Sequence, residues 1–149
     1  MKKILLAIVL MFSMNGLFAQ MHTEIELIRS TYKLEKKAVV ADYLKLTNED
    51  AEKFWPIYNK YEEERVAIGD RRIKLITDYV NDKHKGSVTD ADAMVKESAE
   101  IQKKDTDLRA KYYAQVKTGV NQAVAINFYQ IEDMIATAVK SELYKELAH

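Results

Sequence analysis

The stretch LKLTNEDAEKFWPIYNKYEEE, residues 44–64, decides the fold because it begins like a capped helix and continues with apolar residues at helical spacing. Thr47 is expected to cap this helix by accepting a hydrogen bond from the amide of Asp50. Leu46, before the cap, is expected to pack on Ala51. The stretch therefore predicts a strong helix start.

The same stretch contains Pro56, the only proline of the chain, next to Trp55, the only tryptophan. Proline inside a helix cannot donate a hydrogen bond to the carbonyl four residues earlier, here that of Glu52, and its ring crowds that carbonyl. We therefore expect the helix to bend or break near Pro56.

The first residues, MKKILLAIVLMFSMNGLFAQ, indicate a signal peptide over residues 1–19. Lys2 and Lys3 form the basic start, and an apolar run follows over residues 4–12. A membrane anchor is the alternative, but the run is shorter than the roughly 20 residues that span a bilayer. Because the chain has no cysteine, a lipidated cysteine, a disulfide and a thiolate nucleophile are excluded. We expect a soluble periplasmic protein that is not a lipoprotein.

Composition after residue 19 favours one all-helical domain over residues 20–149. Without the signal peptide, 21 basic and 23 acidic residues remain, which argues against nucleic-acid binding. Glycine occurs at only four positions in the whole chain, and no later segment alternates apolar and polar residues over the length of a strand.

About four helices are expected in an elongated antiparallel hairpin, one of them bent at Pro56. The first covers roughly residues 24–43, and the others begin at the predicted caps Thr47, Thr89 and Asn121. A short turn between two long helices places them antiparallel.

The register of this hairpin predicts one ion pair. Folding the chain about Lys85 and Gly86 places Arg65 near Asp105, and both lie on or beside apolar stripes that otherwise lack charge. We therefore predict an interhelical Arg65–Asp105 pair.

The sequence LxLT at residues 44–47 and a second start at Val88-Thr89 resemble the Spy and CpxP family of small periplasmic proteins, which have two LTxxQ motifs. Leu46 and Thr47 match the first motif, whereas Asp50 occupies the place of its glutamine. The second copy departs from the motif at both its leucine and its glutamine.

A closer similarity is to uncharacterised exported relatives that share TxxxAxxFWPxYxxYE and, downstream, AxxFYQIExxI. The similarity extends over about residues 44–143. The matching residues are Thr47, Ala51, Phe54, Trp55, Pro56, Tyr58, Tyr61 and Glu62, then Ala125, Phe128, Tyr129, Gln130, Ile131, Glu132 and Ile135.

The resemblance implies a curved homodimer that holds unfolded or partly folded envelope proteins without ATP. In such a protein the bend at Pro56 would turn the capped segment across the end of the hairpin; the alternative is that it only lets Phe54 and Trp55 fill the core. Some relatives instead bind the sensor protein of an envelope stress system. A regulatory accessory and a purely structural helical module therefore remain alternatives.

Catalytic and metal-binding patterns are weak in this sequence. His22, His84 and His149 are isolated, although metal sites need several preset ligands. The carboxylates of residues 62–64 point around the helix axis and not at one another. We expect no enzyme activity, no cofactor and no metal site.

The tyrosines are the candidates for a client-binding surface, because aromatic rings contact many apolar shapes. Tyr113 and Tyr129 are expected to point outward and to form this surface. The alternative is that the tyrosine stripe is hairpin core.

Overall fold

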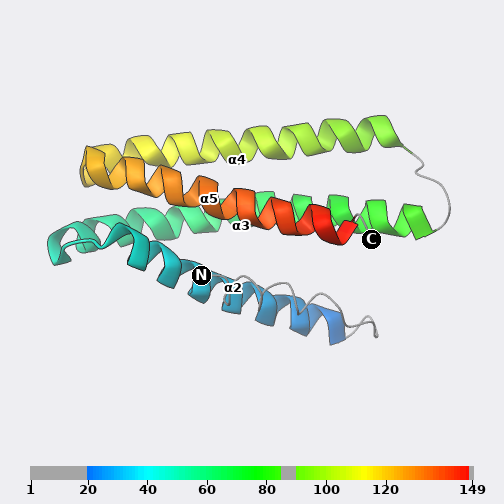
Figure 1. The fold of residues 1–149 in the computed structure, drawn as a ribbon, viewed down its shortest axis with the longest axis horizontal. Helices are drawn as coiled ribbons and strands as arrows, with labels where there is room; N and C mark the ends of the chain where they lie inside the picture. The colour runs from blue at the N-terminus through cyan, green and yellow to red at the C-terminus, as the bar shows by residue number, and fades with distance from the viewer. Residues whose placement is uncertain (1–19, 85–89, 148–149) are drawn as a thin grey trace. The chain divides into compact units, whose positions relative to one another are not determined.

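The computed structural model describes residues 20–84 and 90–147, which form four α-helices and no strand (Figure 1). Side chains are described over residues 32–81 and 90–141. The all-α class is therefore confirmed. The helices are α2 (Gln20–Leu44), α3 (Asn48–His84), α4 (Ala91–Gly119) and α5 (Gln122–Leu147); the predicted signal peptide lies outside the described residues.

The chain divides into two compact units, Met1–Lys45 and Leu46–His149, where one domain over residues 20–149 was expected. The first unit contains α2, and the second contains α3, α4 and α5. At the end of α2, Lys45 has a φ of 45°, and its N–H donates to the carbonyl of Ala41 at 3.1 Å. A left-handed residue of this kind ends a helix by satisfying one of its last carbonyls, and glycine is the usual choice for it.

The start of α3 has the predicted cap. Thr47 Oγ1 accepts a hydrogen bond from the N–H of Asp50 at 3.1 Å, and the Thr47 carbonyl accepts from the N–H of Ala51 at 2.9 Å. Glu49 and Asp50 lie in the first turn, where their negative charges interact favourably with the positive end of the helix dipole.

Helix α3 runs over 37 residues without a break, with Pro56 inside it. The expected break therefore does not occur. Pro56 and Glu52 are both exposed, so the Glu52 carbonyl that loses its helical donor faces the solvent side and can bind water instead. Phe54 is buried and Trp55 half-buried, and their rings meet edge to face with centroids 5.0 Å apart.

Helices α3 and α4 form an antiparallel pair (Figure 1). Near the middle of α3, Glu64 accepts hydrogen bonds from Lys111 at 2.7 Å and from the Tyr112 hydroxyl at 2.8 Å. Further along, Arg71 binds Glu97 through two hydrogen bonds of 2.8 and 2.7 Å.

The start of α4 is capped by Asp90, whose side chain accepts from the N–H of Ala93 at 3.0 Å. The cap predicted at Thr89, one residue earlier, lies outside the described residues.

Helix α5 turns back along α4 and begins beside the start of α3. Asn121 caps it as predicted, because its Oδ1 accepts from the N–H of Val124 at 2.8 Å. The same side chain donates to Asp50 at 3.2 Å and so connects the starts of α5 and α3. At the end of α4, a Cβ on Gly119 would lie 2.8 Å from Ile57 Cδ1, so glycine permits a close approach to α3.

The core of the second unit lies where α3, α4 and α5 meet. Its centre is aromatic: the Tyr61 ring meets Phe128 at 5.2 Å and Tyr112 at 5.4 Å, both edge to face. Tyr58, Tyr61 and Tyr112 of the tyrosine stripe are therefore core. The buried apolar residues of this unit are Phe54, Tyr58, Tyr61, Ile101, Leu108, Tyr112, Val116, Val124, Ala125, Phe128 and Ile131.

The structure shows other partners for both residues of the predicted Arg65–Asp105 pair. Arg65 binds Glu62 on its own helix at 3.0 Å, and Asp105 lies 3.7 Å from Arg72. Because Glu64 contacts Lys111, Arg65 lies near that level of α4, more than one helical turn from Asp105.

Within the described part of the chain, none of the helices combines the length and the apolar character that crossing a membrane requires.

We expect Thr47→Ala to lower the free energy of unfolding by about 1 kcal/mol, because the N–H of Asp50 loses its acceptor at the start of α3. Urea unfolding followed by circular dichroism measures this change. Thr77→Ala, at an exposed interior position of α3, is the matched control and should be neutral or slightly stabilising. Equal effects of the two substitutions would show that the cap does not stabilise the helix.

Candidate functional site

A buried carboxylate, Glu132, lies at the centre of the second unit and is 2% exposed. Its Oε2 accepts a hydrogen bond from the Tyr61 hydroxyl at 2.8 Å, and its Oε1 accepts one from Tyr58 at 3.1 Å. Bonds from hydroxyl groups to an ionised acceptor are stronger than those between neutral groups. This cluster joins α5 to α3 through polar contacts inside an apolar core.

Burial raises the pKa of Tyr58 and of Tyr61 far above the ordinary tyrosine range, and the charge of Glu132 raises both further. Both hydroxyls are therefore protonated donors at neutral pH. The cluster is consequently suited to holding a carboxylate in the core, and neither tyrosine is poised to act as a base.

Arg109 on α4 is a second buried polar group, and it connects α4 with α5. Its Nη1 lies 3.0 Å from Asp133 Oδ1 and donates to the carbonyl of Glu132 at 3.4 Å. Its Nη2 is 3.9 Å from Asp105, and its Nε has no hydrogen-bond partner among the described residues. The guanidinium carbon also lies 5.9 Å from the centre of the Tyr129 ring.

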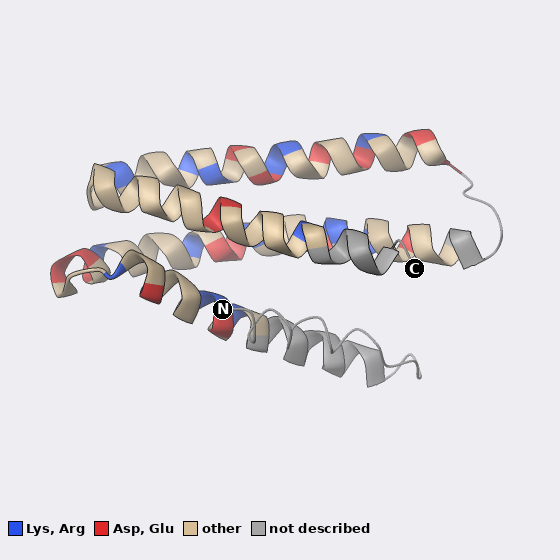
Figure 2. Cartoon of the chain, viewed as in Figure 1, with Lys and Arg blue, Asp and Glu red and all other residues tan. Residues whose placement is uncertain are grey.

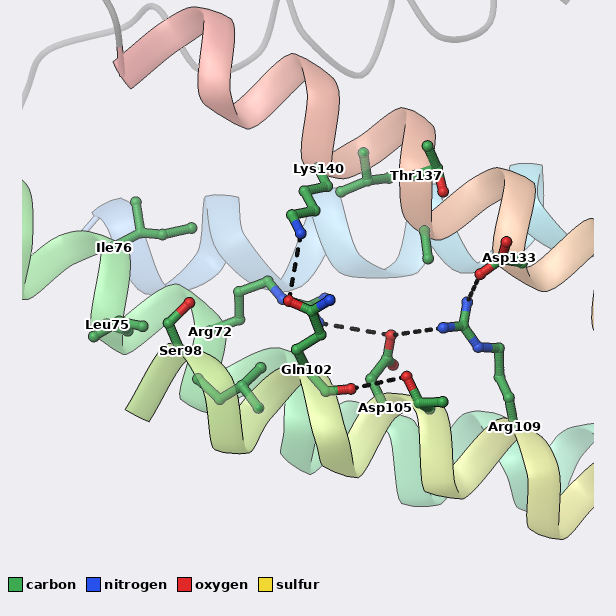
Figure 3. A pocket seen from close by; sticks show the side chains of 14 residues that line it. Arg72, Leu75, Ile76, Ser98, Gln102, Asp105, Arg109, Asp133, Thr137 and Lys140 are labelled. Carbon is green, nitrogen blue, oxygen red and sulfur yellow. Dashed lines mark hydrogen bonds and ion pairs between the residues drawn. The ribbon is translucent and has the colours of Figure 1, made fainter. Parts of the chain in front are cut away.

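A cavity of about 280 Å³ lies beside Arg109, between α3, α4 and α5 (Figure 3). Its apolar lining comes from all three helices. Small side chains at Ser98 and Ala136 leave this space open, whereas the neighbouring core is filled by large rings. The apolar lining residues are Leu75, Ile76, Ile101, Ala136 and Val139.

Charged and amide groups surround this apolar surface. Arg72 Nη2 lies 3.7 Å from Asp105 Oδ2, and Lys140 Nζ donates to Gln102 Oε1 at 3.4 Å. Figure 3 shows the ends of Arg72, Gln102 and Lys140 converging at the middle of the cavity. An apolar pocket with a few convergent polar groups is the usual form of a site for a small ligand.

The two residues predicted as a client surface lie together. The rings of Tyr113 on α4 and Tyr129 on α5 meet edge to face with centroids 6.2 Å apart, and both side chains are half-buried. The structure therefore makes one aromatic pair of them, with part of each ring accessible.

Large apolar side chains are also exposed on each helix of the second unit. Val95 on α4 is 70% exposed and Met134 on α5 is 55% exposed. Acidic and basic residues alternate along α4, whereas the first ten residues of α5 have no charged side chain (Figure 2). The other exposed residues of this kind are Val66, Ile73 and Ile126.

Sequence reasoning placed Glu132 in a motif but missed its role. One signal was present, because Glu132 is the first charged residue of α5 and follows directly after the apolar Ile131. Arg72 and Arg109 were missed altogether, since their positions depend on the register of the hairpin. Among the described residues, no group of three or more histidine, aspartate or glutamate side chains is arranged to hold a metal ion.

Comparison of the chain with protein-family models, with curated proteins and with solved structures finds no match. The geometry of the cluster, the cavity and the exposed apolar side chains is therefore the basis for a proposed function.

We expect the free energy of unfolding to fall as pH rises above about 10, the ordinary pKa of tyrosine. Burial, the hydrogen bond to Glu64 and the Glu64 charge raise the pKa of Tyr112 to about 12. Since the pKa of Tyr112 is raised in the folded state, its contribution to the free energy of unfolding is complete below pH 10. This contribution is lost as pH rises through about 12.

Urea unfolding between pH 8 and pH 11.5, roughly the window set by these tyrosine pKa values, measures this loss. Tyr112→Phe should make the loss less steep, whereas Thr77→Ala, at an exposed site on α3 without a titrating group, should leave it unchanged. A free energy of unfolding that stays constant over this range would contradict the assignment.

Proposed function

We propose that this protein is an exported helical binding protein that holds unfolded or partly folded envelope proteins without ATP, acts as a homodimer and resembles the Spy and CpxP family. The observation that most favours this function is the exposure of large apolar side chains on all three helices of the second unit. Among them, the flexible thioether side chain of Met134 suits contacts with apolar segments of different shape.

The Tyr113–Tyr129 pair supports the same proposal. Each ring is held on one side by the other ring, and Tyr129 is also held by Arg109. A half-buried aromatic ring offers contact area with little loss of side-chain entropy on binding. The pair is therefore a suitable anchor for an apolar segment of a client.

Residues 20–149 should slow the aggregation of chemically denatured client proteins at substoichiometric to equimolar amounts. Light scattering with several unrelated clients measures this effect. Ile126→Gln combined with Met134→Gln should raise the amount of protein needed, because two exposed apolar contacts on α5 are lost. Asn59→Gln with Ala110→Gln, at two exposed sites, is the matched control and should behave like the wild type.

No suppression with any client would overturn the proposal. One saturable membrane-protein partner found by crosslinking in the envelope, without general suppression, would favour the alternative of an accessory that binds a stress sensor. If both double variants suppress aggregation equally less well than the wild type, the exposed apolar residues of α5 do not form part of the client-binding surface.

A further inference from the structure

We propose that the cavity between α3, α4 and α5 binds a small monocarboxylic acid, with the carboxylate on Arg72 and the apolar chain on the lining of the cavity. This small-molecule site is separate from the holding of client proteins and does not depend on it.

Arg72 has unused hydrogen-bonding capacity. Its guanidinium makes no hydrogen bond within the described residues, and its nearest acid is Asp105 at 3.7 Å. Hydrogen bonds from N–H to oxygen span about 2.7–3.2 Å, so this contact is electrostatic only. Arg71, one residue earlier, instead forms two short bonds to Glu97. An incoming carboxylate can therefore take the fork of Arg72 without displacing a hydrogen bond.

The net charge of the cavity lining also favours an anionic ligand. Three cations and two acids line the cavity, which leaves one positive charge in excess. Asp133 is already bound by Arg109, and Asp105 lies between Arg72 and Arg109, so the charge in excess is that of Lys140, which lines the same cavity as Arg72. One further carboxylate brings the lining to neutrality.

The size and shape of the cavity restrict the ligand to a small molecule. The volume of about 280 Å³ is near the lower end of the roughly 300–1,000 Å³ found for ligand pockets. Leu75, Ile76 and Val139 provide apolar surface on two helices, and Ala136 leaves room above it. A compact acid with a short hydrocarbon chain fits this combination, whereas a nucleotide-sized cofactor does not.

The test is a titration of the purified protein with octanoate, kept below the concentration at which it forms micelles. Isothermal calorimetry gives the affinity, and amide chemical shifts locate the site. We expect saturable binding with shifts at Gln102 and Thr137, which line the cavity. Octanol, which has the same chain without the charge, should bind at least about tenfold more weakly, and octylammonium should not bind.

Two neighbouring arginines provide matched variants. Arg72→Gln should weaken octanoate binding about tenfold and leave octanol binding unchanged, and Arg72→Lys should restore part of the affinity. Arg71→Gln removes the neighbouring arginine of the same helix. Because Arg71 forms a salt bridge with Glu97 and does not line the cavity, this substitution should have no effect on octanoate binding.

Equal affinity for octanoate and octanol would overturn the proposal, as would equal effects of the two glutamine variants. Shifts confined to residues outside the cavity, or no saturable binding, would do the same. The aggregation assay uses no fatty acid. A negative octanoate titration therefore does not affect the proposed client binding, and a negative aggregation assay does not affect the proposed carboxylate site.

Discussion

The structure of the second unit depends on how the Glu132 carboxylate is held in the core. An unpaired carboxylate in an apolar interior is strongly unfavourable, and its burial is tolerated only when donors satisfy it. Tyr58 and Tyr61 supply such donors from α3, and both are themselves fixed by ring contacts with Phe128. The position of α5 on α3 is thereby specified by hydrogen bonds as well as by apolar contact.

The caps reinforce packing at the same end of the unit. Asn121 begins α5 and also binds Asp50 in the first turn of α3, so two helix starts are tied together. Close approach at Gly119 brings the end of α4 against Ile57. Further along the helices no large rings fill the interior, and the cavity occurs there, where small side chains at Ser98 and Ala136 leave space among apolar and charged residues.

Much of the helical plan could be predicted from local sequence. The caps at Thr47 and Asn121 depend on residues only three positions apart, so the sequence contains the whole interaction. Of the bend or break expected at Pro56, the break does not occur, because one missing hydrogen bond on an exposed face does not outweigh the packing of the residues on either side.

Contacts between helices were harder to predict. The Arg65–Asp105 pair required the centre of the turn to be known to within a residue or two, and an error of that kind moves every partner along the opposite helix. The roles of Glu132 and Arg109 depend on the meeting of three helices, and the cavity depends on which side chains are small at one level. None of these is encoded in a local motif.

The account rests on the coupling between Tyr61 and Glu132, and a double-mutant cycle with Tyr61→Phe and Glu132→Gln measures it most directly. Urea unfolding of the wild type, the two single variants and the double variant gives the interaction energy. We predict a coupling of about 1.5–3 kcal/mol, as for hydrogen bonds to charged groups. The same cycle with Tyr79→Phe, about 27 Å along α3 from Tyr61, should give none. Additive effects of Tyr61→Phe and Glu132→Gln, within about 0.5 kcal/mol, would contradict the account.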